Sequence, residues 1–182
     1  MLIQRLVWII VVFNCFFSQI TNAQSISNFK NVPVFKEKLS LTISVANNLN
    51  KKEKDNLECL AWNLYFEARG GTMAEKIAIT YIPINRLNDP RFTNDICENV
   101  FQYLVVKGKK VWQFSWARRR LSEKWKLEEK AWTESQEIAY KVMQGHLADP
   151  SNGAKFFHHL NANLGFIPRS GKIQLGSHYF YR

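Results

Sequence analysis

Apolar residues recur at helical spacing from Leu57 to the glycine pair that follows position 69. Leu57, Leu64 and Ala68 fall on one side of such a helix, while Trp62 and Phe66 add apolar surface on the opposite side. A helix that is apolar on both sides is buried all round, and paired glycines are a common end signal. The pattern therefore predicts a buried helix that ends just before Gly70.

The next stretch begins with a capping signature. Thr72 followed three residues later by Glu75 is a capping box, which predicts a second helix through residues 76–87. Pro83 lies inside that run, so we expect it to kink or interrupt the helix. A turn at residues 88–90 and a short helix within residues 95–103 complete this region.

The later part of the chain changes from helix to strand. Residues 106–110 are basic and predict a loop, and residues 111–116 predict an extended or irregular segment. Residues 122–144 form the clearest amphipathic helix, with one apolar face made of Leu127, Ala131, Ser135, Ile138 and Val142. The short runs AKFFHHL and QLGSHYFYR then predict strands. The fold class expected is α+β, mainly helical, with a few short C-terminal strands.

The first 23 residues differ from the rest. One Arg precedes an apolar run from Leu6 to Phe17, and polar residues follow up to Ala23. This order is typical of a secretory signal, and the run is shorter than the roughly 20 apolar residues of a membrane span. We expect export to the periplasm or cell exterior, with membrane contact only through an uncleaved signal. Residues 24–54 then read as an arm or linker, and residues 55–182 as one domain.

Composition adds charge and a thiol pair to this picture. Removing residues 1–23 takes away Arg5 and no acidic residue, which leaves 24 basic against 15 acidic residues and a formal charge of +9. Such a chain is drawn to anionic polymers, but no nucleic-acid motif accompanies the charge, and a monomer is expected. Cys59 and Cys97 remain after signal removal, and in an oxidising compartment they either pair or stay as buried thiols.

The predicted buried helix carries one acid, Glu67, close to its end. A carboxyl among apolar residues is partly desolvated, which raises its pKa, and a nearby helix C-terminus disfavours the anion further. An acid still protonated near neutral pH can donate its proton to a leaving oxygen. The alternative is an ordinary ion pair with Arg69 or another base.

Several blocks together resemble the SleB/CwlJ cell-wall hydrolases. They are CLAWNLYFEARGGTMAEKIAITYIPINRLNDPRFTNDICENVFQ, then QFSW, DPSNGAKFFHH and GSHYFY, in the order of that family. The resemblance covers roughly residues 57–181 and implies a lysozyme-like, peptidoglycan-cleaving domain whose catalytic acid is Glu67. The chain departs from the family at Gly71, where an acidic residue is common, and at Pro83.

The reaction expected is cleavage of the β-1,4 bond between N-acetylmuramic acid and N-acetylglucosamine in the glycan strands of peptidoglycan. Hydrolysis normally needs a second carboxylate, but Asp89 and Asp149 each precede a proline in a turn and Asp95 is placed to cap a helix. A single acid suits a lytic transglycosylase, in which Glu67 acts as general acid and then as base, with no cofactor.

The remaining blocks offer substrate contacts. Gln113, Ser115 and Trp116 provide hydrogen bonds and a stacking face for sugar rings, with core packing as the alternative. Tyr65 fits the core as well as the cleft. Asn85 and Arg86, whose roles the sequence leaves open, either brace the acid or cap a helix.

Two histidines raise rival functions. With His178 and Glu67, the pair His158 and His159 would form a zinc site for an amidase that cuts the stem peptide. Adjacent strand residues point to opposite faces, which argues against both binding one metal and favours one facing substrate. A third alternative is a non-catalytic wall-binding module, in which Glu67 is dispensable.

Overall fold

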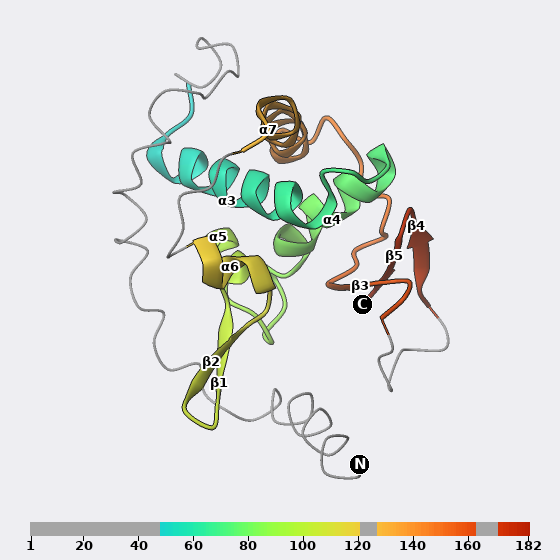
Figure 1. The fold of residues 1–182 in the computed structure, drawn as a ribbon. Coiled ribbons are helices and arrows are strands. Elements are labelled where there is room, and N and C mark those ends of the chain that lie inside the picture. The colour runs from blue at the N-terminus through green and yellow to red at the C-terminus, as the bar shows by residue number, and fades with distance from the viewer. Residues whose placement is uncertain (1–47, 121–126, 163–170) are drawn as a thin grey trace.

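The structure, a computed structural model, describes residues 48–120, 127–162 and 171–182. Helices dominate it, and the strands form one two-stranded and one three-stranded antiparallel sheet (Figure 1). The mainly helical α+β class with short C-terminal strands is confirmed. In chain order the elements are α3 (Lys51–Ala68), α4 (Met73–Asn85), α5 (Ile96–Val100), β1 (Tyr103–Val106), β2 (Lys109–Trp112), α6 (Ser115–Arg120), α7 (Glu129–Met143), β3 (Phe156–His159), β4 (Ile173–Leu175) and β5 (His178–Tyr181).

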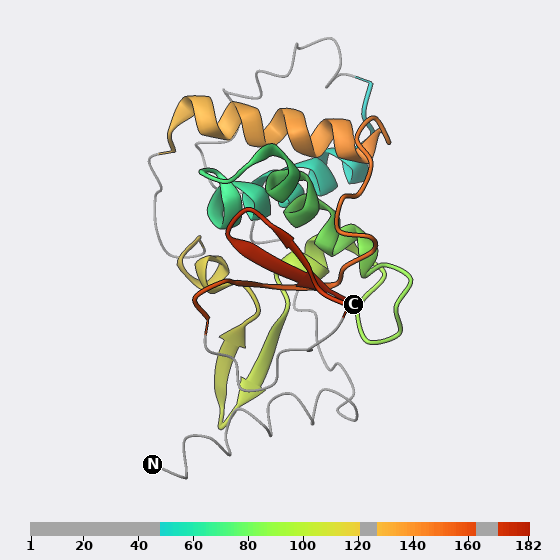
Figure 2. The same cartoon turned by 90° about the vertical axis from the view of Figure 1, so that its right-hand side faces the viewer.

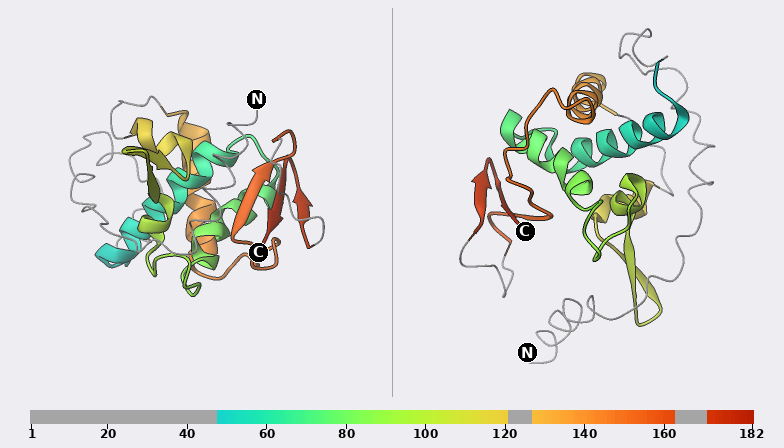
Figure 3. Two further views of the ribbon diagram at one scale, coloured as in Figure 1. Left: turned by 90° about the horizontal axis from the view of Figure 1, so that it is seen from below. Right: turned by 180° about the vertical axis from the view of Figure 1, so that it is seen from behind.

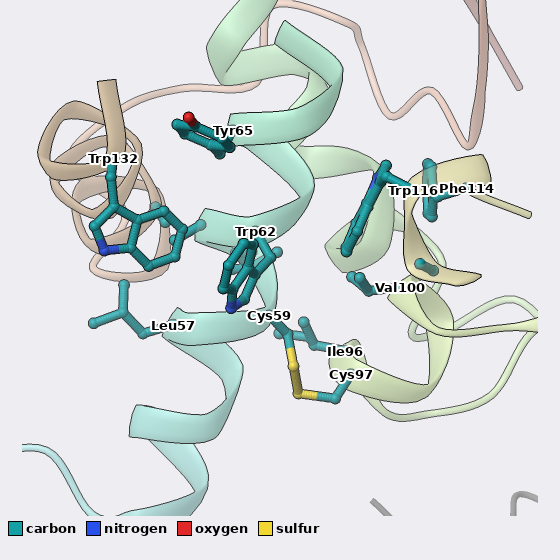
Figure 4. Packing of buried hydrophobic residues seen from close by; sticks show 14 of the residues in the cluster. Leu57, Cys59, Trp62, Tyr65, Ile96, Cys97, Val100, Phe114, Trp116 and Trp132 are labelled. Carbon is teal, nitrogen blue, oxygen red and sulfur yellow. A yellow bond between two sulfur atoms is a disulfide. The ribbon is translucent and has the colours of Figure 1, made fainter. Parts of the chain in front are cut away.

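Helix α3 is the centre of the packing, with α4, α5 and α7 all in contact with it. It contributes Leu57, Leu60 and Trp62 to one apolar cluster, and Leu64 and Ala68 to a second. All five side chains are buried, which confirms a helix enclosed on more than one side. Figure 4 shows aromatic and aliphatic groups packing on it from both flanks.

The start of α3 lies earlier than the sequence pattern indicated. The helix begins at Lys51, four residues before the domain start expected at Asp55. Asn50 caps it, because Asn50 Oδ1 accepts from the Glu53 N–H at 3.0 Å and Glu53 Oε2 accepts from the Asn50 N–H at 2.7 Å. This first turn is polar, so apolar periodicity did not reveal it, whereas the capping box alone would have.

Helix α4 has the predicted capping box but is not interrupted by its proline. Thr72 Oγ1 accepts from the Glu75 N–H at 3.3 Å, and Glu75 Oε2 accepts from the Thr72 N–H at 3.2 Å. Pro83 lies in the last turn and the helix continues to Asn85. A proline leaves the carbonyl four residues earlier without its helical partner. Here that carbonyl, of Ile79, accepts a long 3.4 Å bond from Asn63 Nδ2 of α3.

The basic loop predicted at residues 106–110 is instead the tip of a β-hairpin. Strands β1 and β2 pair antiparallel, and the two residues between them, Lys107 and Gly108, have φ of 49° and 74°. Positive φ at both positions is the type I′ geometry that suits a two-residue hairpin turn. Residues 111–112 fall in the segment predicted as extended or irregular, but the hairpin itself was missed. The reason is that its apolar side chains do not alternate between buried and exposed: Leu104, Val105 and Val111 all face solvent. Figure 2 shows the hairpin extending away from the helices.

Helix α7 begins at Glu129, seven residues after the predicted start at position 122. Residues 121–126 lie outside the described part, but Leu127 precedes the helix and does not belong to it. The rest of the predicted apolar face is buried, and Gly145, with φ of 71°, follows the helix end as expected.

The C-terminal strands form a sheet in the order β3-β5-β4. Their alternation gives the sheet two aromatic faces: Phe157 contacts Phe180 and His178, while His158 contacts Tyr181 on the other face. Figure 3 shows this sheet beside the helices, as a separate layer of the domain. Phe180 is fully buried and anchors the sheet to the second apolar cluster.

The predicted signal at residues 1–23 and residues 24–47 of the arm predicted at 24–54 lie outside the described residues. Among the helices that the structure describes, none is both long and apolar enough to cross a bilayer.

Cys59 of α3 and Cys97 of α5 form a disulfide, with their Cα atoms 5.4 Å apart (Figure 4). Of the two alternatives that the sequence left open, the structure has the paired one. The bridge joins the central helix to the short helix beside it and closes a loop of 38 residues in sequence separation.

We expect reduction of this bond to lower the free energy of unfolding by roughly 4 kcal/mol, because an open chain of this length gains entropy when unfolded. Urea unfolding of residues 24–182 with and without reductant measures the difference. Cys59→Ala/Cys97→Ala, insensitive to reductant, is the control. Two free thiols per unreduced, unfolded chain would contradict the pairing.

Candidate active site

Glu67 lies in the last turn of α3, where the buried helix reaches the protein surface. Its carboxyl lines a cleft of about 400 Å³. The cleft lies between the end of α3, the segment that enters α6, and strands β3 and β5. Its other lining residues are Arg86, Gln113, Phe114, Ser115, Phe156, Phe157, His158, His159, His178 and Tyr181.

Burial raises the pKa of Glu67 from 4.5 to about 7. The Trp116 indole N–H lowers the pKa of Glu67 and so offsets part of this rise. Trp116 Nε1 does not, however, form a hydrogen bond of regular geometry with any described residue. No ion pair of Glu67 is found among the described residues, so the proposed alternative, a structural pair with Arg69, is absent there; Arg69 lies over the Tyr65 ring instead. The carboxyl is therefore about half protonated at neutral pH.

Two of the predicted contacts face the cleft from the start of α6. Gln113 and Ser115 are both exposed, and they flank the buried Phe114. The alternation arises because the chain turns from β2 into α6 here, so that the aromatic ring enters the core and its polar neighbours stay at the surface. Core packing, the expected role for Phe114, agrees with its 4% exposure, although its edge also contributes to the cleft wall.

The two other predicted aromatic contacts, Trp116 and Tyr65, do not line the cleft. Trp116 is buried and stacks on Phe66 with ring centroids 4.9 Å apart. Tyr65 packs edge-on against Trp132, and its hydroxyl accepts from the Glu128 N–H at 3.1 Å (Figure 4). Both rings serve the core because α3 is enclosed on both flanks, so a stacking face for sugar must come from other residues.

Strand β3 brings the predicted histidines to the opposite wall. His159 is exposed, and His158 is buried between the rings of Tyr179 and Tyr181. Both ring nitrogens of His158 lack a hydrogen-bond partner among the described residues. Burial, aided by the charges of Lys172 and His178, lowers the pKa of His158, so its ring is neutral at pH 7.

Arg86, which lines the cleft, is almost completely buried. Its Nε donates to the Lys155 carbonyl at 2.9 Å, and its guanidinium lies 4.6 Å from the Phe92 ring centre. Nη1 has no partner within the described chain, and burial lowers the pKa of the group to about 9. Its neighbour Asn85 binds Asp149 and the Ala154 carbonyl, so together they tie the end of α4 to the segment before β3.

The other acids considered as second carboxylates have structural roles. Asp89 accepts from Arg91 and from Lys155, which together hold the pKa of Asp89 far below its usual range. Asp149 accepts from the Ser151 and Gly153 N–H groups of its own turn. Asp95 caps α5 by accepting from the Glu98 N–H at 2.9 Å, as predicted. Of the acids in the described part of the chain, Glu67 is the one that lines the cleft.

Sequence reasoning thus placed Glu67, Gln113, Ser115, His158 and His159 around one cleft, which the structure brings together. It did not identify the aromatic walls or Tyr181, whose signal is only the alternation of the C-terminal strands. No three His, Cys, Asp or Glu side chains are grouped as a metal would require within residues 48–120, 127–162 and 171–182. The ligand set imagined for zinc is not assembled there.

Comparisons with known proteins follow this geometry. A model of the cell wall hydrolase family matches residues 70–181. Among solved structures, the catalytic domain of the Bacillus cereus SleB protein is similar, with a TM-score of 0.54 and 16% identity, over 74% of this chain and 99% of that domain. The catalytic domain of the germination-specific lytic transglycosylase SleB from Bacillus anthracis is similar too, with a TM-score of 0.54 and 17% identity, over 75% and 98%.

No curated protein sequence matches significantly. At such low identity the structural likeness speaks for the fold, while the family match speaks for membership. The match begins at Gly70, three residues after Glu67, and it includes the whole opposite wall of the cleft. Because the matched segment spans more than half of the chain, this protein belongs to the cell wall hydrolase family, whose members degrade peptidoglycan.

Proposed function

We propose that the protein is a lytic transglycosylase that cleaves the β-1,4 bond between N-acetylmuramic acid and N-acetylglucosamine, with Glu67 as general acid and base. The observation that carries the proposal is a desolvated carboxyl with a pKa of about 7 at the wall of a cleft. A proton held at neutral pH is what a leaving sugar oxygen needs.

In the first half of the reaction, Glu67 gives its proton to the bridging oxygen and positive charge builds at the anomeric carbon of muramic acid. In the second half, the 6-hydroxyl of the same sugar attacks that carbon, and the Glu67 carboxylate takes the hydroxyl proton. The glycosidic C–O bond breaks, an internal C1–O6 bond forms, and Glu67 ends protonated as it began. The product is a 1,6-anhydromuramic acid end.

The shortage of acids in the cleft favours this reaction over hydrolysis. Retaining and inverting glycosidases use two carboxyl groups about 5–9.5 Å apart, the second as nucleophile or as base for water. Among the described residues, Glu67 is the one acid that lines the cleft. The carboxylates of Asp89 and Asp149 accept hydrogen bonds within their own turns. When a hydroxyl of the same sugar attacks, no second acid is needed, because the Glu67 carboxylate left by the first step serves as the base.

Gln113, Ser115 and the exposed His159 line the two walls of the cleft, which supports a role for them in binding sugar hydroxyl and acetamido groups. Phe156, Phe157 and Tyr181 supply the apolar surface that Tyr65 and Trp116 do not. We take the enzyme to act as a monomer on glycan strands outside the cytoplasm, reached through the signal at residues 1–23. A zinc amidase and a non-catalytic binding module remain the outcomes against which the proposal is tested.

The first prediction concerns the products. Residues 24–182 incubated with isolated peptidoglycan are expected to release disaccharide-peptides that end in 1,6-anhydromuramic acid, identified by mass spectrometry. Glu67→Gln keeps the side-chain size but has no proton to give, so release should fall by at least about 1,000-fold while binding in a sedimentation assay persists.

Other products discriminate between the alternatives. Reducing-end sugars would mean hydrolysis, and free stem peptides released in a chelator-sensitive way would mean the amidase. Release by Glu67→Gln at the wild-type rate would remove this residue from the mechanism, and binding without any release would support the wall-binding module.

The second prediction is the pH dependence of cleavage. The reactive form has a protonated Glu67, so kcat/KM is expected to fall about tenfold for each pH unit above about 7. Initial rates of fragment release between pH 5 and 9 measure this, with sedimentation of Glu67→Gln on the same wall as a control for altered binding. A rate that rises steadily to pH 9 would contradict a general acid with this pKa.

The third prediction concerns stability. Between pH 4.5 and 7 the unfolded chain loses the Glu67 proton while the folded protein retains it, so rising pH favours unfolding, by about 3 kcal/mol in total. Glu67→Gln removes this effect: it should unfold at higher urea than wild type above pH 7 and gain nothing below pH 4.5. The exposed Glu137→Gln on α7 controls for the loss of one carboxylate. Equal stability of both proteins at pH 8 would show that Glu67 is not desolvated.

A further inference from the structure

A second buried acid, Glu75, lies behind the cleft wall. Its side chain is enclosed at 2% exposure in a space kept by two glycines. A Cβ on Gly71 would lie 2.5 Å from Glu75 Oε2, and a Cβ on Gly176 would collide with the same carboxyl group. The family resemblance leads one to expect an acidic residue at position 71, but this chain has a glycine there. The Glu75 carboxyl, from the next helix, occupies the space beside that glycine.

The Glu75 carboxylate is saturated with donors from two elements. Oε2 accepts from the Thr72 N–H at the start of α4. Oε1 accepts from the Ser177 N–H at 3.1 Å and the Ser177 hydroxyl at 2.7 Å, and it lies 2.5 Å from His178 Nδ1. Burial alone would raise the pKa of Glu75, but the hydrogen bonds from His178 and Ser177 hold it below its ordinary value. Glu75 is thus an anion at neutral pH.

An anionic carboxylate has only lone pairs to offer, so His178 Nδ1 must carry the hydrogen that joins them. His178 lines the cleft that contains Glu67, and its ring is held by the Phe157 ring at 5.3 Å and the His159 ring at 5.4 Å. With Nδ1 engaged by Glu75, Nε2 is the nitrogen left for a ligand.

We propose that Glu75 fixes the orientation of the His178 ring through Nδ1, and that His178 Nε2 binds a hydroxyl group of the sugar held in the Glu67 cleft. His178 would contact substrate directly, and Glu75 would be a positioning residue that acts through it. The inference rests on the proposed glycan substrate, but it adds a contact on the wall opposite Glu67. A sugar hydroxyl fits because it can both donate and accept a hydrogen bond, and it is the polar group that such a substrate carries in greatest number.

A purely structural role for Glu75 would not require its contact with His178 Nδ1. The Ser177 N–H and hydroxyl already tie the β4–β5 turn to the start of α4. The imidazole adds a third bond to the same Oε1 atom, and it comes from a side chain that lines the cleft. The bond therefore sets the orientation of a cleft residue in addition to closing a turn.

The direct test is ¹⁵N NMR of histidine-labelled Glu67→Gln protein, which cannot cleave, titrated with amidase-treated glycan strands. We expect His178 to show a protonated Nδ1 in the free protein, and the Nε2 resonance to move on binding. A bare Nδ1, or an Nε2 resonance that stays in place while other cleft resonances move, would overturn the proposal. This readout needs no catalysis, so it decides the proposal even where the wild-type protein releases no anhydro product and the proposed function fails.

Variants provide the kinetic test. His178→Asn keeps a donor near the Nδ1 position and loses Nε2, and kcat is expected to fall on the order of 10- to 100-fold with the fold intact by circular dichroism. Glu75→Gln should lower kcat less, because it keeps the volume and one acceptor. Thr72→Ala is the matched control: it weakens the same helix start without touching the imidazole. Wild-type kcat in His178→Asn, or equal kcat losses in Glu75→Gln and Thr72→Ala, would contradict the proposal.

Discussion

The candidate site depends on the enclosure of one helix. Helix α3 places Leu60 and Leu64 in two different apolar clusters, so neighbours surround it almost to its last turn. Glu67 sits in that turn, and its raised pKa follows from the same burial that stabilises the domain. The proton on Glu67 is thus a consequence of core packing and not of any charged neighbour.

Three carboxyl groups of this chain have pKa values shifted in different directions because their surroundings differ. Glu67 has apolar surroundings and holds its proton to about pH 7. Asp89 has two cations within hydrogen-bond distance, and its pKa falls far below the usual range. Glu75 is as buried as either, yet donors from Ser177 and His178 keep it ionised. Burial therefore raises the pKa of a carboxyl only where hydrogen bonds and cations do not offset it.

The sequence predicted what depends on local periodicity and capping. The α3 stripe, the Thr72–Glu75 box and the cap at Asp95 are encoded within a few residues, and all three are present. The β1–β2 hairpin was missed because its apolar residues face solvent, and Tyr65 was left open because only the position of Trp132 decides its surroundings. Contacts between α4 and the C-terminal sheet, 102 or 103 positions apart, had no sequence signal.

The cleft is assembled from parts of the chain that carry different kinds of information. The family match covers the strands β3 and β5 that line the cleft but begins after Glu67. Glu67 is a candidate acid because of its setting, since it is the carboxyl of the described cleft and it lacks a cation and a full set of donors. Behind the opposite wall, Arg86 Nη1 and both ring nitrogens of His158 are buried without a hydrogen-bond partner among the described residues. The polar groups that a ligand can reach are instead the exposed ones, Gln113, Ser115 and His159, which line the cleft together with Glu67. A cleft that combines one desolvated carboxyl with exposed hydrogen-bonding groups and aromatic rings suits a polar, hydroxyl-rich ligand, which is why the proposed function assigns it a glycan.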